Sequence, residues 1–136
     1  MAIVDAQRFG VFQYGVFSDV NDSRIERHLP TNARNITLEK RATGHRAKYS
    51  ISESDLKEYL DGQWAQHGNR SSIPRAELRE GAPVAREQFD LRYGDLGWLP
   101  LENAVEFHSP VASDGSGATY FFDARIGTAY HHAGYW

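Results

Sequence analysis

The fold is decided by residues 36–60, which read ITLEKRATGHRAKYSISESDLKEYL. The first half of this stretch alternates apolar with polar residues on both sides of Ala42-Thr43-Gly44, as in Ile36-Thr37-Leu38 and again in Ala47-Lys48-Tyr49. A period of two is typical of antiparallel strands that bury one face, and a glycine suits the positive-φ position of a tight turn. The alternation therefore predicts a β-hairpin whose apolar face points inward.

The second half of the stretch predicts a helix at about residues 53–66. Ser52 is a good N-cap residue, and Asp55 follows it at the spacing of a capping box. Four apolar residues then recur at the i, i+3, i+4 and i+8 positions of one helical face: Leu56, Tyr59, Leu60 and Trp64. We expect this helix to pack on one face of the sheet.

The N-terminal segment, residues 8–17, carries apolar residues on both alternation phases. Phe9 and Val11 share one face of the expected strand, whereas Phe12 and Tyr14 share the other. A strand of this kind is normally covered on both faces or lies in an interface. The pattern therefore indicates a strand that has neighbours on both faces.

The rest of the chain adds shorter elements. A short helix is predicted at residues 23–28, before Pro30, and another between residues 83 and 93. Two strands at residues 119–123 and 128–132 flank a glycine-containing turn and form a second hairpin.

Because the strands are grouped rather than regularly alternating with helices, the chain is predicted to be α+β, with residues 1–136 forming a single domain. We expect a mainly antiparallel sheet of five or six strands. The helix at about residues 53–66 is expected on one face of it, together with one or two short helices. The first strand and the final hairpin are expected near the centre of the sheet, since both are apolar on both phases.

Part of the chain resembles a known layout. The resemblance is carried, in chain order, by His28-Leu29-Pro30, Ala33, Asn35-Ile36, Ala47, Tyr49, Ile51-Ser52, Leu56 and Tyr59-Leu60. These residues resemble small uncharacterised bacterial α+β domains of unknown function, in which a leucine-proline opening precedes two strands and a capped helix. The resemblance covers residues 28–64. It implies a bacterial α+β domain and assigns no catalytic residue, ligand or activity.

Composition makes several classes of function improbable. With 15 Lys and Arg against 18 Asp and Glu, the net charge is −3, so we expect no nucleic-acid partner. The chain has no Cys, which rules out thiol nucleophiles, disulfides and Cys-ligated zinc. No apolar run is long enough to cross a membrane, so we expect no membrane insertion. Since the first residues also lack a signal-peptide pattern, we expect a cytoplasmic protein or the soluble part of an exported protein whose targeting segment is absent.

Glu106 and His108 are the candidates for acid–base chemistry. They are two residues apart on an expected strand, share one face, and could pass a proton; the alternative is a solvated strand edge. A mononuclear metal site could form from His108, Asp123 and His132, but no His-x-x-x-His spacing supports it, which favours solvated or hydrogen-bonded histidines. No nucleotide-binding or nucleophile-elbow motif occurs, and we expect no cofactor.

Aromatic residues provide the main indication of function. The chain has 7 Phe, 7 Tyr and 3 Trp, concentrated after residue 88. One helix layer covers only one face of a sheet, so part of this surplus is expected to meet another chain, a ligand, a covering loop or solvent. The candidate binding residues are Trp98, Tyr120, Phe122, Tyr130, Tyr135 and Trp136.

Two hypotheses follow for the function. The first is a small non-catalytic protein-interaction domain that binds a protein partner or a second copy of itself through an aromatic sheet face or the C-terminal tail. The alternative is a small-molecule-binding domain or minor enzyme, whose aromatic-lined cleft has Glu106 and His108 as polar groups. A deep, partly apolar cavity favours the second hypothesis, and a flat apolar face favours the first.

Overall fold

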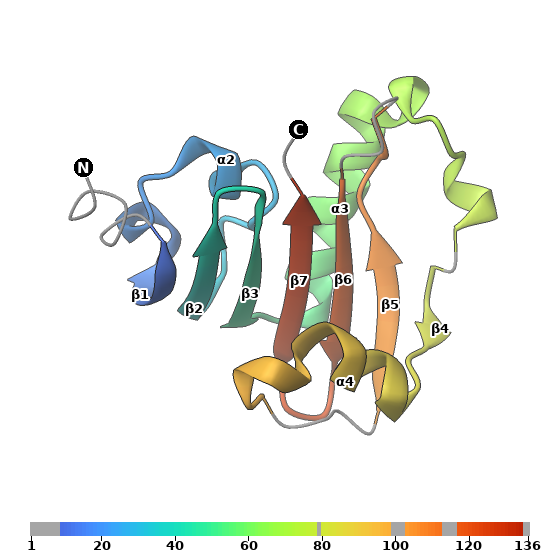
Figure 1. Ribbon diagram of the computed structural model, residues 1–136. Coiled ribbons are helices and arrows are strands. Elements are labelled where there is room, and N and C mark those ends of the chain that lie inside the picture. Colours follow the sequence, from blue (N-terminus) through green and yellow to red (C-terminus); the bar gives the residue numbers. More distant parts are fainter. Residues whose placement is uncertain (1–8, 79, 99–102, 113–116, 135–136) are drawn as a thin grey trace.

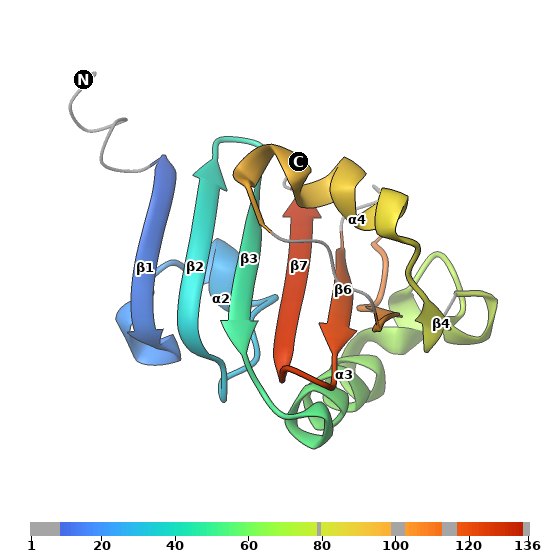
Figure 2. The ribbon, with the colours of Figure 1, turned by 90° about the horizontal axis from the view of Figure 1, so that it is seen from below.

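The computed structural model describes residues 9–78, 80–98, 103–112 and 117–134. They form an α+β arrangement with one antiparallel sheet in the order β1-β2-β3-β7-β6-β5-β4 and helices on both faces (Figures 1 and 2). The strands are β1 (Gly10–Val16), β2 (Arg34–Arg41), β3 (Gly44–Ser50), β4 (Ala82–Pro83), β5 (Ala104–His108), β6 (Ala118–Asp123) and β7 (Thr128–Gly134). The helices are α2 (Ser23–Glu26), α3 (Glu53–His67) and α4 (Arg86–Tyr93), with 3-10 turns η1 (Phe17–Asp19), η2 (Gly68–Arg70), η3 (Arg75–Glu77) and η4 (Gly94–Leu96).

The hairpin and helix predicted from residues 36–60 are confirmed. β2 pairs with β3 in an antiparallel register that places Leu38 opposite Ala47. The Ser52 side chain caps α3, since its Oγ accepts a hydrogen bond from the backbone N–H of Asp55 at 3.1 Å. The apolar stripe of α3 buries Leu56 and Leu60 against the sheet. Local sequence therefore determines this unit.

The sheet has seven strands, not the expected five or six. The additional strand, β4, has two residues and lies where we expected a polar connection and the opening of a helix. The residues on either side of β4 form hydrogen bonds with β5. The N–H of Gly81 donates to the Glu106 carbonyl, and the N–H of Val84 donates to the Ala104 carbonyl. Pairing with a distant strand thus takes this backbone out of the helix, which begins at Arg86 instead of residue 83.

The final hairpin, β6–β7, lies in the middle of the sheet as expected, and β7 joins the two halves. β1, by contrast, is an edge strand that pairs only with β2 among the described strands, so its expected central position is wrong. Alternation reports how apolar each face of a strand is, whereas it does not report how many strands flank it.

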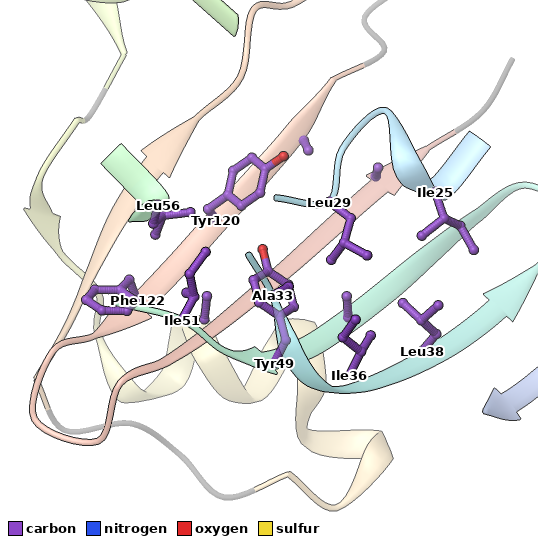
Figure 3. Close-up of a cluster of buried hydrophobic side chains, with 14 of the residues drawn as sticks. Ile25, Leu29, Ala33, Ile36, Leu38, Tyr49, Ile51, Leu56, Tyr120 and Phe122 are labelled. Carbon is purple, nitrogen blue, oxygen red and sulfur yellow. The ribbon is translucent and has the colours of Figure 1, made fainter. Parts of the chain in front are cut away.

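Both faces of the sheet carry a hydrophobic core. The larger core lies beneath α2 and α3 and includes the buried side chains of Ile25, Leu29, Ile36, Leu38, Tyr49, Leu56, Tyr120 and Phe122 (Figure 3). The smaller core lies beneath α4, where Phe89 and Tyr93 pack against Phe121 and Tyr130. Figure 1 shows α3 behind the sheet and α4 in front of it. The expectation that helices cover only one face is therefore wrong.

Candidate functional site

Three of the aromatic residues expected to bind a partner are buried in the two cores. Tyr120 and Phe122 face α3, and Tyr130 faces α4; their exposed fractions are 0%, 1% and 5%. Trp98 is half-buried, stacks on Tyr93 with ring centroids 5.5 Å apart, and lies beneath the Lys48 ammonium. The expected exposed aromatic face and the expected aromatic-lined cleft are not formed by these four residues, because α4 covers the second face. Tyr135 and Trp136 lie outside the described residues.

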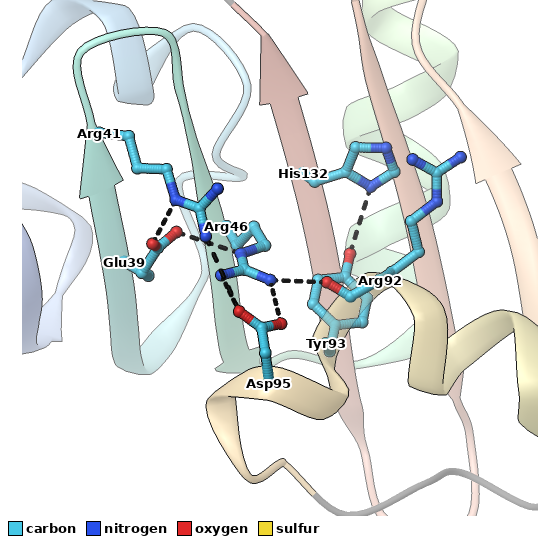
Figure 4. Close-up of polar contacts among 7 residues, drawn as sticks. All are labelled: Glu39, Arg41, Arg46, Arg92, Tyr93, Asp95 and His132. Carbon is cyan, nitrogen blue, oxygen red and sulfur yellow. Dashed lines mark hydrogen bonds and ion pairs between the residues drawn. The ribbon is translucent and has the colours of Figure 1, made fainter.

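An ion-pair network fastens the covering layer to the sheet (Figure 4). The Arg46 guanidinium donates to both carboxylate oxygens of Asp95, at 2.7 and 2.9 Å, and to the Arg92 carbonyl at 2.8 Å. Its Nε also donates to Glu39 at 3.1 Å. The bond from Arg46 lowers the pKa of the Asp95 carboxyl. This bidentate contact holds η4 over β3, so the cover on this face reaches the middle of the sheet.

The β1 edge is the most exposed apolar part of the sheet. The segment Gly10–Val16 contains no charged residue, and Val11 and Val16 expose 60% and 44% of their surface. Phe12 and Tyr14 are half-buried, and the Lys40 ammonium lies over both rings, at 4.7 and 5.1 Å from their centroids. Strand edges in soluble proteins are usually shortened, charged or interrupted by proline to prevent pairing with other chains. β1 has none of these protections.

The opposite edge of the sheet differs in each of these respects. β4 has two residues, one of them Pro83, which has no N–H to offer to another strand. At the β1 edge, by contrast, a shallow and open depression of about 450 Å³ lies at β1 and β2. It is lined by Gln13, Tyr14, Gly15, Asn35, Ile36 and Thr37. The two edges of the described sheet are therefore unequal: β1 offers seven residues for pairing, whereas β4 offers two.

The structure brings Glu106 and His108 together, as the sequence predicts. Their side chains lie 2.5 Å apart, measured from Glu106 Oε2 to His108 Nε2. Glu106 is 5% exposed, and its other oxygen accepts a hydrogen bond from the Gln88 amide of α4 at 3.0 Å. The remaining ring nitrogen of His108, Nδ1, lies 3.4 Å from Thr119 Oγ1 on β6. The imidazole thus lies between a buried carboxylate and a hydroxyl.

The proposed metal ligands do not converge. Asp123 lies at the opposite end of β6 from Thr119, where its carboxylate accepts from the backbone N–H of Arg125 at 2.9 Å. His132 is on the same face as His108 but contacts Tyr93, with its Nδ1 3.5 Å from the phenolic oxygen. Within the described ranges, no group of three or more His, Asp or Glu side chains is placed to hold a metal ion.

A cluster of buried histidines was not identified from the sequence. His131 is fully buried; its Nε2 lies 2.8 Å from His45 Nε2, and its Nδ1 lies 2.9 Å from the Tyr49 hydroxyl. Burial, reinforced by the charge of neighbouring histidines, lowers the pKa of His45 to about 3 and that of His131 well below its usual range. The alternation of the strands could have indicated this cluster. His45 lies on the same face of β3 as Ala47 and Tyr49, and His131 lies on the same face of β7 as Ala129.

Comparisons of the chain with protein-family models, with curated protein sequences and with solved structures give no match. The described residues form an α+β fold with a seven-stranded antiparallel sheet, whose β1 edge is uncharged and whose β5 strand carries the Glu106–His108 pair. No helix in the described part of the chain is long and apolar enough to span a membrane.

Proposed function

We propose that the chain is a protein-interaction domain that forms a homodimer by antiparallel pairing of β1 with β1 of a second copy. The observation that carries the proposal is the uncharged, seven-residue edge strand with apolar side chains on both faces. An added strand satisfies the outward backbone N–H and C=O groups and buries the exposed flanks of Val11 and Val16.

The sequence of β1 is compatible with pairing to itself. A two-fold axis perpendicular to the sheet at Gln13 pairs residues whose numbers have the same parity, and so keeps both faces continuous. In this register, Phe12 lies opposite Tyr14 of the partner subunit, and Val11 lies opposite Gly15 of the partner subunit. Aromatic cross-strand pairs stabilise antiparallel sheets, and no like charges on the two strands oppose one another.

The expected dimer is weak and reversible. Edge-to-edge pairing of seven-residue strands buries less surface than the roughly 800 Å² per partner of a standard interface. We therefore expect a dissociation constant on the order of 10 μM, which corresponds to about 7 kcal/mol. Such an affinity makes assembly depend on local concentration.

Sedimentation velocity over a range of protein concentrations tests this proposal. The parent chain is expected to shift from monomer to dimer, and Val11→Lys, which puts a charge at the edge, is expected to remain monomeric. Leu91→Lys is the matched control, because Leu91 is 86% exposed on α4, far from β1. A parent chain that stays monomeric at several hundred micromolar, or a Val11→Lys variant that dimerises like the parent, contradicts the proposal.

A further inference from the structure

A row of polar side chains crosses three neighbouring strands on the α4 face of the sheet. His108 on β5 is directly opposite Thr119 on β6, and Thr119 is directly opposite His132 on β7. Directly paired residues of antiparallel strands project to the same face, so the three side chains lie side by side. In Figure 1, α4 crosses the other ends of β5, β6 and β7, and no described helix lies in front of the ends that carry this row.

The hydrogen bonds determine which nitrogen of His108 carries the proton. An ionised carboxylate only accepts hydrogen bonds, so the tautomer that fits the 2.5 Å contact with Glu106 is the one in which Nε2–H donates. Nδ1 then has a free lone pair, and it faces the Thr119 hydroxyl at 3.4 Å. The order hydroxyl, imidazole, carboxylate is the arrangement in which an imidazole acts as a base toward a hydroxyl nucleophile.

The carboxylate and the imidazole are both held in place. Gln88 donates to the second oxygen of Glu106 at 3.0 Å, so the buried carboxylate has a fixed orientation. The backbone N–H of His108 donates to Glu80 at 3.0 Å, and Glu80 in turn pairs with Arg75 at 2.9 Å. A catalytic group needs such support from neighbours to keep its geometry. The supporting residues lie on α4 and in the segment that precedes β4.

His132 completes the surroundings of Thr119. Burial lowers the pKa of His132 to about 4, and the charge of Arg92 adds to this effect, so its imidazole is neutral at neutral pH. When the Tyr93 hydroxyl donates to Nδ1, the Nε2 atom of His132 carries the proton and is a donor on the residue paired directly with Thr119. A donor at this position can stabilise an oxyanion that forms on a substrate bound at Thr119.

We infer that Thr119, His108 and Glu106 form an acyl-transfer site that acts on small carboxylic esters. Thr119 Oγ1 forms a bond to the ester carbonyl carbon while its proton moves to His108 Nδ1, and Glu106 stabilises the resulting imidazolium. The bond to the leaving oxygen then breaks, and that oxygen takes the proton from Nδ1. A water molecule, deprotonated by the same imidazole, hydrolyses the acylated Thr119 and restores the site.

The distance of 3.4 Å from Nδ1 to Oγ1 is at the long end for a hydrogen bond. Catalytic hydrogen bonds are often long before substrate binds and shorten in the complex. The inference is independent of dimer formation, because Thr119 and the β1 edge lie in different parts of the sheet. The two proposals can therefore fail separately.

Acetylation of the intact protein by p-nitrophenyl acetate tests the inference. We expect a burst of nitrophenol that approaches one equivalent, together with an acetyl group that peptide mass spectrometry locates on Thr119. Thr119→Val is expected to abolish both, and His108→Gln to slow the burst by about 100-fold or more. Thr119→Ser keeps the hydroxyl and is expected to retain the burst.

The matched control is Thr128→Val, which removes another half-buried strand threonine, one whose hydroxyl donates to the Ile126 carbonyl. This variant is expected to react like the parent, and circular dichroism confirms that each variant is folded. If Thr119→Val does not fold, the decision rests on His108→Gln and on the location of the acetyl group in the parent. A parent chain with no acetyl group on Thr119, or acetylation confined to lysines and the N-terminus, overturns the inference. A burst that survives His108→Gln unchanged also overturns it.

Discussion

Lowering the pH is expected to unfold this protein through its buried histidines. Four histidines have lowered pKa values, chiefly because burial disfavours the charged imidazolium. The pKa is about 4 for His28 and His132, about 3 for His45, and well below its usual range for His131. When His45 and His131 are both charged, the bond between their Nε2 atoms also breaks, because both nitrogens are then donors.

The sign of the effect follows from proton linkage. In the unfolded chain each histidine binds a proton below a pH of about 6.5, whereas the folded chain does so only near its lowered pKa. The stability is therefore complete above about pH 6.5 and decreases as the pH falls toward 4. In this pH range, each such histidine lowers the free energy of unfolding by about 1.4 kcal/mol per pH unit, or by roughly 2 kcal/mol at pH 5. The losses at the four histidines have the same sign, so together they remove a large part of the stability of a small domain.

Urea denaturation followed by circular dichroism, between about pH 7 and pH 5, measures this loss. We expect the parent chain to be unfolded without urea near pH 5 or slightly below it. His132→Asn is expected to reduce the slope of stability against pH by about one proton. Thr128→Val, which removes no titratable group from β7, is the control and is expected to leave the slope unchanged. A parent whose stability is constant from pH 7 to pH 5 refutes the argument.

Two further predictions concern backbone positions and helix ends. Gly44→Ala is expected to destabilise the fold by at least about 2 kcal/mol, because a Cβ at this position would collide with the Ala133 carbonyl of β7. Gly62→Ala is expected to stabilise the fold by about 1 kcal/mol, because the added Cβ meets open space on α3. Thermal unfolding of both variants checks this, and equal effects of the two contradict it. Ser52→Ala is expected to lower the free energy of unfolding by about 1 kcal/mol, because it removes the N-cap of α3, and Ser54→Ala is expected to lower it much less. Urea denaturation measures both variants, and the opposite order of the two contradicts the assignment of the cap.

The parts of the fold that sequence predicts are those built from neighbouring residues. The β2–β3 hairpin, α3 and the β6–β7 hairpin each have their own pattern of alternation, turn residues and caps. The edge position of β1 and the existence of β4 depend on pairing between distant segments, which no local pattern encodes. The sequence also did not indicate that α4 forms a second helix layer. Only two of its eight residues, Phe89 and Tyr93, are buried, so its apolar pattern is weak.

The candidate sites divide in a similar manner. Glu106 and His108 were found because two residues on one strand must share a face. Thr119 and Gln88 were not found, since their contacts with this pair depend on the register between β5 and β6 and on the placement of α4. The aromatic residues were expected to leave a surplus on an uncovered sheet face, whereas α4 covers that face and buries Tyr130 in a second core.

The central claim is that β1 is an interface and not a solvent-exposed edge. Hydrogen exchange of the backbone amides in Gly10–Val16, measured at low and at several hundred micromolar protein, tests it most directly. We expect the outward amides of β1 to become more protected as the concentration rises, while the amides of central strand β7 stay unchanged. Equal exchange of the β1 amides at both concentrations would contradict the claim.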